Sequence, residues 1–268
     1  MTKNNIKELS IQVNLNGLSF CILNRTSNTI EFLNNIQFQH KLNPFDVLNR
    51  LKTELSANSV FSDEFDAITV VHQNELSTLV PKKLYSENNK ADYLKFNTKI
   101  LKTDFIADDD VAINDSVNLY IPYVNLNNYI FETFGEFTYK HSSTVLIDTI
   151  LQKTSQNSNA EMYLHVNSFM IEVSIVENRQ LQLFNVFEYH SKEDFIYYVL
   201  FVFEQLKLDV ETTTIHLSGN IDKNNELYDL LYTYVRHVEL EKLSFSYNFS
   251  ENIDTDKLHH HFLILNTF

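Results

Sequence analysis

Residues 9–23 read LSIQVNLNGLSFCIL, and this stretch decides the fold of the chain. Apolar side chains occupy every second position before and after Asn16-Gly17, as in two strands that each present one face to a core. Asn-Gly favours the positive φ values that a two-residue type I′ turn requires. The stretch therefore predicts a β-hairpin whose turn is Asn16-Gly17.

The same pattern returns in the second half of the chain. A shift of 151 residues carries Asn16 onto Asn167, and both copies continue as a third strand, a helix and a further strand. The polar stretch 154–160, TSQNSNA, suits a linker between the copies. The sequence thus predicts an internal duplication with two halves, residues 1–154 and 155–268.

Helix and strand signals also recur in each half. Asn43 followed by Pro44 is expected to begin a helix, because asparagine caps helices and proline fits their first position. Residues 65–72 form an apolar run that suits a buried parallel strand. Ser191 is expected to cap a helix over 195–208, which is apolar on almost all sides and predicts burial between layers or against a partner.

Composition limits the classes of function. The 268 residues carry a formal charge of −14, which disfavours nucleic acid and anionic membrane surfaces as partners. The single cysteine, Cys21, lies in an apolar stretch, and the N-terminus has no signal-peptide pattern. We therefore expect a soluble, cytoplasmic protein.

Glycine is scarce. The chain has three glycines, Gly17, Gly135 and Gly219, and no two of them are close in sequence. Loops that bind phosphate through backbone N–H groups use several glycines within a few residues. The sequence therefore disfavours a glycine-rich phosphate loop.

Four short motifs resemble a known protein family. They are LSIQVNLNGLSF, TLVP at 78–81, YIP at 120–122 and HSSTVLI at 141–147. Together they are similar to an uncharacterised bacterial family, found mostly in Bacteroidetes, that has no assigned function. The resemblance implies the actin-like ATPase fold: an α/β protein of two tandem ribonuclease-H-like halves, with mixed sheets flanked by helices.

The resemblance also indicates where a ligand would bind. In catalytic relatives each hairpin turn is a phosphate loop with an aspartate near the end of its first strand. A strand that ends in paired glycines binds the nucleoside. The corresponding residues here carry no carboxylate in either turn, and they define a candidate cleft between the halves: Asn14, Asn16, Gly17, Ser19, Asn167, Ser168, Ser218, Gly219 and Asn220.

These absences favour a non-catalytic protein. Mg²⁺ bound beside phosphates needs a carboxylate nearby, so ATP with Mg²⁺ is disfavoured as a cofactor and we assign no catalytic residue. The leading hypothesis is a pseudo-ATPase that acts as a binding or scaffold protein for an unknown protein partner. Two alternatives stay open: a nucleotide-binding protein or weak ATPase that takes its carboxylates from Glu172 or Asp148, and a module that binds a small molecule in the neutral cleft.

The run His259-His260-His261 raises the question of a metal site. In a strand, His259 and His261 would share a face, but zinc takes three or four ligands and no cysteine is near. We therefore interpret the run as incidental surface histidines and assign no metal ligand.

Overall fold

The computed structural model describes residues 5–156 and 159–268 and divides into two compact units. The first unit comprises residues 1–145, 245–256 and 263–268, and the second comprises residues 146–244 and 257–262. The division falls within helix α4 (Ser142–Lys153). The predicted boundary at residue 154 separates sequence repeats and stays a prediction.

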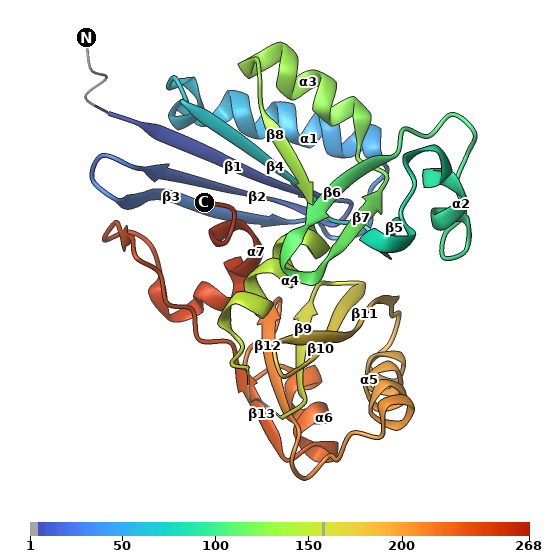
Figure 1. Cartoon of the computed structure of the whole chain (residues 1–268). Helices are drawn as coiled ribbons and strands as arrows, with labels where there is room; N and C mark the ends of the chain where they lie inside the picture. Colours follow the sequence, from blue (N-terminus) through green and yellow to red (C-terminus); the bar gives the residue numbers. More distant parts are fainter. Residues whose placement is uncertain (1–4, 157–158) are drawn as a thin grey trace. The chain divides into compact units, whose positions relative to one another are not determined.

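A six-stranded mixed sheet forms the centre of the first unit (Figure 1). Its order is β14-β3-β2-β1-β4-β8, with β1, β2 and β3 antiparallel and with β4 and β8 continuing in parallel from β1. The strands are β1 (Lys7–Asn14), β2 (Gly17–Asn24), β3 (Thr29–Gln37), β4 (Ala67–His72), β8 (Thr138–His141) and β14 (Asn248–Phe249). The predicted hairpin of residues 9–23 is therefore β1 and β2.

Two helices cover one face of this sheet. The side chain of Asn43 accepts hydrogen bonds from the N–H groups of Phe45 and Asp46, and Pro44 begins α1 (Pro44–Ala57), as the sequence predicts. α3 (Val124–Phe134) packs beside α1, and both bury their apolar residues against β1, β2 and β4. Burial of this apolar surface is the main stabilising term of the unit.

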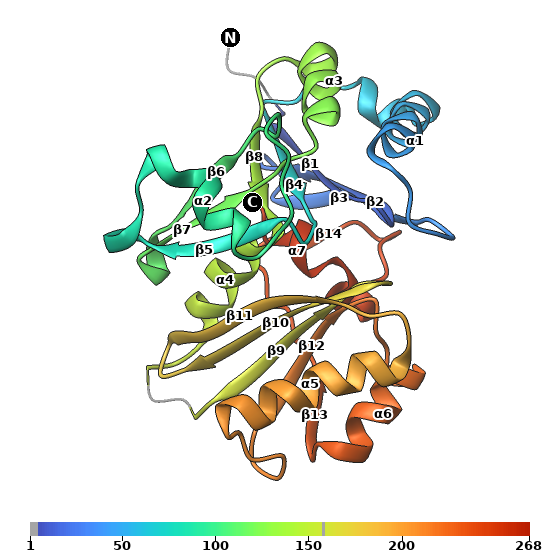
Figure 2. The same cartoon turned by 90° about the vertical axis from the view of Figure 1, so that its right-hand side faces the viewer.

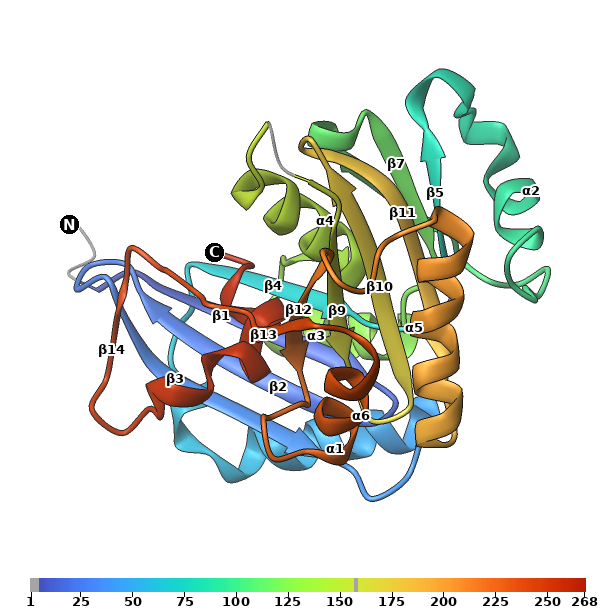
Figure 3. The ribbon, with the colours of Figure 1, turned by 90° about the horizontal axis from the view of Figure 1, so that it is seen from below.

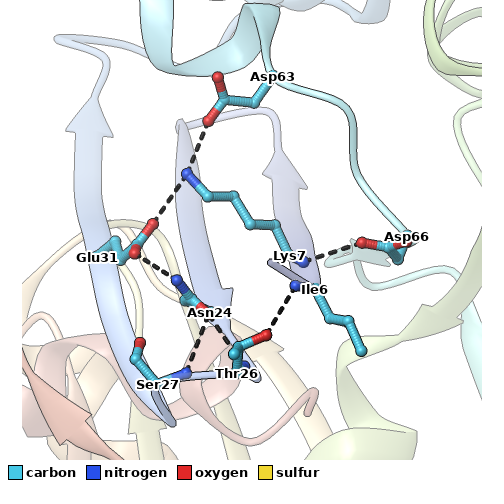
Figure 4. Close-up of polar contacts among 8 residues, drawn as sticks. All are labelled: Ile6, Lys7, Asn24, Thr26, Ser27, Glu31, Asp63 and Asp66. Atoms are coloured by element: carbon cyan, nitrogen blue, oxygen red, sulfur yellow. Dashed lines mark hydrogen bonds and ion pairs between the residues drawn. The ribbon is translucent and has the colours of Figure 1, made fainter. Parts of the chain in front are cut away.

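A network of charged and amide groups fixes the start of β1 (Figure 4). Lys7 Nζ lies 2.8 Å from Asp63 Oδ2 and 3.0 Å from Glu31 Oε2, and the Lys7 N–H donates to Asp66. The ion pair with Asp63 raises the pKa of Lys7. Asn24 donates to Glu31 and accepts from the turn after β2, so these contacts hold the start of β1, the end of β2 and the start of β3 together.

A smaller antiparallel sheet is inserted between β4 and β8 in the chain. It consists of β5 (Ser77–Pro81), β7 (Ser116–Tyr120) and β6 (Ala107–Val111), with the short helix α2 (Lys90–Lys95) packed against it. Short 3₁₀ helices occupy Ser59–Ser62, Lys82–Leu84, Glu87–Asn89 and Ala112–Asn114.

The second unit repeats the main sheet of the first. Its order is β11-β10-β9-β12-β13, which matches β3-β2-β1-β4-β8, and the strand directions match as well. The strands are β9 (Glu161–Val166), β10 (Met170–Glu177), β11 (Gln180–Glu188), β12 (Thr214–Gly219) and β13 (His237–Leu240). The predicted α/β fold of two ribonuclease-H-like halves is confirmed.

Helices α5 (Lys192–Leu206) and α6 (Glu226–Tyr234) lie on one face of the second sheet (Figure 2). Ser191 Oγ accepts a hydrogen bond from the Asp194 N–H and begins α5, as predicted. α5 buries Phe195, Val199 and other apolar residues against its own sheet and leaves Tyr197 and Phe201 exposed.

The C-terminal segment contributes residues to each of the two units. Figure 3 shows it beside β3, where β14 pairs in parallel with residues Thr29 and Ile30. It continues through a 3₁₀ segment (Thr255–His261) and α7 (Phe262–Leu265). Among the described residues, no helix combines the length and apolarity needed to cross a bilayer.

Candidate functional site

The hairpin turn of the first unit is Leu15-Asn16, one residue earlier than predicted. Asn14 pairs with Gly17 across the hairpin, and none of Asn14, Asn16 and Gly17 has a positive φ. The type I′ turn at Asn16-Gly17 is therefore wrong. The side chain of Asn14 determines the turn instead, because its Oδ1 accepts a 2.7 Å hydrogen bond from the Asn16 N–H in an Asx turn.

Gly17 is needed because β3 approaches it closely. A Cβ at this position would lie 2.5 Å from the carbonyl oxygen of Ile36, which precedes Gln37, the partner of Gly17 in the β2–β3 ladder. Strand packing accounts for this glycine without a bound phosphate.

Amide side chains, not carboxylates, surround the turn. Gln12 Nε2 and Asn14 Nδ2 both donate to Gln73 Oε1, at 2.9 and 3.0 Å. Ser19 is buried beside them, opposite Gln12 in the ladder. Asn16 Oδ1 is buried and has no hydrogen-bond partner within the described part of the chain.

Gln73 is a residue of this site that the sequence reasoning missed. It follows β4 directly, and β4 runs parallel to β1, so the ends of both strands meet at one edge of the sheet. In α/β sheets, ligands bind where the carboxyl ends of parallel strands meet. Applied to the predicted strand 65–72, this rule identifies Gln73 as a candidate site residue.

In the second unit the two predicted segments come together. Gly219 pairs with Val166 at the end of β9, and the Asn220 N–H donates to the Val166 carbonyl at 2.7 Å. Asn167 and Ser168 follow Val166 in the turn between β9 and β10, and the Ser168 N–H donates to Asn167 Oδ1 at 2.7 Å.

Gly219 combines two constraints that only glycine meets. Its φ is +84°, and a Cβ would lie 2.1 Å from the Val166 carbonyl oxygen. As at Gly17, the close approach of two strands explains the residue. The predicted cleft that would join these residues to Asn14, Asn16 and Ser19 stays a prediction.

A carboxylate does lie near this edge of the second sheet. Glu172 stands opposite His165 in the β9–β10 ladder, is 1% exposed, and lines a small cavity with His165 and Ser218. His165 Nδ1 and Ser218 Oγ are hydrogen-bonded at 2.9 Å. The cavity measures about 10 Å³, room for about one water molecule, so it does not hold a nucleotide.

A family model described as a protein of unknown function, DUF3822, matches residues 1–238. The chain belongs to the DUF3822 family. A search of the curated proteins finds no match.

Solved structures show that the DUF3822 chain has the actin-like ATPase fold. A Bacteroides thetaiotaomicron protein with actin-like ATPase fold and unknown function is 24% identical, with a TM-score of 0.78 over 90% of this chain and 92% of that chain. A chain of the PilM–PilN type IV pilus biogenesis complex is 9% identical, with a TM-score of 0.64 over 97% and 96%. The fold predicted from the four motifs is confirmed.

A polar cluster in the first unit of the DUF3822 protein contains the middle member of the acidic run Asp108-Asp109-Asp110. The sequence predicts an exposed turn at this run, and the prediction is wrong for Asp109, which lies in a strand and is half-buried. Asp109 lies in β6, where its carboxylate accepts hydrogen bonds from the His141 N–H (2.8 Å), Thr144 Oγ1 (2.7 Å) and Tyr120 OH (3.0 Å). Burial raises the pKa of Asp109. The cluster links the inserted sheet to the start of α4.

The same cluster contains a serine and a histidine in contact. Ser143 Oγ lies 2.7 Å from His141 Nδ1, but both residues are fully buried, and Asp109 contacts the backbone of His141, not its ring. A nucleophile must be reached by its substrate, so this arrangement serves structure rather than acyl transfer.

A larger cavity in the second unit lies at the opposite end of β9 from the predicted ligand residues. It measures about 530 Å³, and its lining includes Glu177, Lys207 and Asp209. Its size is that of small-molecule pockets in general, but its charged groups are two acids and one base, which do not favour a phosphate.

The protein is expected to lose stability in mild acid, because three of its histidines are buried in the folded state. Burial lowers the pKa of His72 to about 4 and those of His141 and His165 to about 3, against about 6.5 unfolded. Between pH 6.5 and about pH 4 these three histidines therefore bind protons in the unfolded chain but stay neutral in the folded chain. Their contribution is complete above pH 6.5 and is lost as the pH falls from 6.5 towards 4. At pH 5 each histidine is expected to cost about 2 kcal/mol.

Urea unfolding at pH 7 and at pH 5 measures this loss. His165→Asn should show a smaller difference between the two pH values than the unchanged protein. His40→Asn, which alters an exposed histidine, should show the same difference. Equal differences for all three proteins would contradict the prediction.

Proposed function

We propose that this chain is a non-catalytic binding or scaffold protein, a pseudo-ATPase whose phosphate loops have degenerated. The observation that carries the proposal is the internal use of the amides at the first turn. Asn14 Oδ1 accepts a hydrogen bond from the Asn16 N–H, and Asn14 Nδ2 donates one to Gln73 Oε1. A neutral turn whose Asn14 side chain is engaged within the protein offers neither a carboxylate for Mg²⁺ nor charge to balance a triphosphate.

The two glycines support the same view. Gly17 and Gly219 are both accounted for by a backbone carbonyl within 2.5 Å of where a Cβ would be. A bound phosphate is therefore not needed to explain why either position is glycine.

Protein binding is the role that the surface favours. Tyr197 and Phe201 stack on the outer side of α5, with 61% and 39% of their surfaces exposed. Aromatic side chains are enriched at protein interfaces. A chain with the same fold occurs in the PilM–PilN complex, so the fold is compatible with assembly. The partner we propose is a protein, in the cytoplasm of a bacterium.

A weak ATPase is the second candidate, and Glu172 is the observation that favours it. This buried carboxylate, in β10, lines the same small cavity as Ser218. Ser218 belongs to the end of β12, the strand that would face a nucleoside. The unpartnered acceptor Asn16 Oδ1 could take a hydrogen bond from a ligand hydroxyl. An acceptor oxygen repels a phosphate, which is why this candidate ranks second.

Phosphate release from Mg-ATP and Mg-GTP tests the proposal. We expect the rate of the unchanged protein to equal that of Glu172→Gln prepared in the same way, because both report only contaminating activity. A saturable rate that Glu172→Gln abolishes would overturn the proposal and establish the second candidate.

A further inference from the structure

Three potential metal ligands meet in the second unit. Asp222 follows β12, while His259 and His260 lie in the 3₁₀ segment near the C-terminus. Asp222 Oδ1 is 3.0 Å from His260 Nε2 and 3.3 Å from His259 Nε2, and all three ligand atoms lie within 4.8 Å of one another. His259 is buried, so the interpretation of the run as surface histidines is wrong for that residue.

We propose that Asp222, His259 and His260 bind one divalent transition-metal ion of the zinc class. Zinc binds histidine nitrogen at 2.0–2.1 Å and carboxylate oxygen at 2.0–2.2 Å, so a tetrahedral ion holds its ligand atoms about 3.3 Å apart. The two nitrogen–oxygen separations are close to that value. Imidazole and carboxylate together suit zinc, nickel and copper better than magnesium or calcium.

The neighbours of the three side chains leave one carboxylate oxygen to the histidines. Lys257 Nζ lies 3.9 Å from Asp222 Oδ2, whereas Oδ1 is the oxygen next to His259 and His260. His259 is 5% exposed and anchors the site, while Asp222 and His260 are 32% and 21% exposed and leave one side open to water. Three protein ligands with an open position is the arrangement of zinc sites that bind a further ligand.

The backbone carbonyl of Ile221 also contacts one of the proposed ligand atoms. His259 Nε2 lies 2.8 Å from the Ile221 oxygen and donates its proton there when no ion is bound. An ion at the site would displace that proton, as metal binding to imidazole generally does. The ion would also link His260 to Asp222 in the loop after β12, and these two residues are 38 positions apart in the chain.

Zinc titration of the untagged, chelator-stripped protein tests the site. With ZnSO₄ in competition with a chromogenic chelator, we expect one zinc per chain and at least a tenfold loss of affinity in both His260→Ala and Asp222→Asn. His190→Ala removes an exposed histidine distant in sequence and should bind as the unchanged protein does. Co²⁺ in place of zinc should give the visible bands of a four-coordinate site, and Asp222→Asn should lose them.

Two results would overturn the proposal. One is the absence of stoichiometric zinc from the unchanged protein. The other is unchanged affinity in Asp222→Asn, which keeps the size of the side chain and is expected to fold even if His260→Ala does not. Bound zinc that survives both substitutions would belong to other histidines among the ten in the chain.

Discussion

Gly219→Ala is expected to lower the free energy of unfolding of the second unit by about 4 kcal/mol. Two costs add. A φ of +84° strains any residue with a Cβ by about 1–3 kcal/mol. The Cβ would also lie 2.1 Å from the Val166 carbonyl oxygen, and forcing the two strands apart costs about 1–3 kcal/mol more. Urea unfolding monitored by circular dichroism measures the sum.

The other two glycines separate these costs. Gly135 ends α3 with a φ of +85° and nothing within 4 Å of its Cβ position, so Gly135→Ala tests backbone strain alone. Gly17 has no positive φ but lies against the Ile36 carbonyl, so Gly17→Ala tests the close approach alone. Each should cost about 2 kcal/mol. A loss at Gly219 no larger than that at Gly135 would contradict the role given to the Val166 carbonyl.

Asp109→Ala is expected to destabilise the first unit by about 3 kcal/mol. The substitution leaves the Tyr120 hydroxyl, the Thr144 hydroxyl and the His141 N–H without their acceptor, and each unsatisfied buried donor costs about 1–3 kcal/mol. The total is smaller than the sum of these three costs, because the side chains around residue 109 can shift and water can enter the space left by the carboxylate. Asp109→Asn should cost about 1 kcal/mol, because its oxygen still accepts two of the bonds and the Tyr120 hydroxyl can accept from its amide.

The neighbouring aspartates are matched controls within the same strand. Asp108 and Asp110 are exposed and form surface ion pairs with Lys90 and Lys82. Asp108→Ala and Asp110→Ala should each cost less than about 1 kcal/mol in the same urea experiment. Losses as large as that of Asp109→Ala would show that the whole triplet, and not the buried cluster, stabilises this strand.

Local patterns predicted the architecture well. The alternation in residues 9–23 and the caps at Asn43 and Ser191 act over a few residues, so they can be recognised without knowing the fold. The repeat at a shift of 151 residues can be recognised for a different reason, because it compares such local patterns with each other. The turn type failed for a local reason as well. Asn-Gly correctly marked a hairpin, but the Asn14 side chain caps the turn and moves it back by one residue.

The contacts that define the candidate sites are not local, and this limited the prediction. Gln73 reaches Gln12 across 61 residues, and Asp222 meets His260 across 38. The resemblance implies the strand order that brings Gln73 to Gln12, but it does not indicate which side chains after each strand point towards one another. The run Asp108-Asp109-Asp110 shows the same limit, because only the strand β6 and its contacts with Tyr120, His141 and Thr144 show that the middle member is half-buried.

Thermal unfolding with and without 1 mM Mg-ATP, Mg-ADP or Mg-GTP tests the central claim most directly. A nucleotide present at about 100 times its dissociation constant stabilises a protein by about 2.7 kcal/mol, which raises the Tm of a chain of this size by about 5–10 °C. We predict no rise beyond the scatter of replicates, because the turns offer no carboxylate for Mg²⁺ and no free glycine backbone for phosphate. A rise of several degrees that Asn16→Ala or Ser218→Ala removes would contradict the account and place a nucleotide at the predicted cleft.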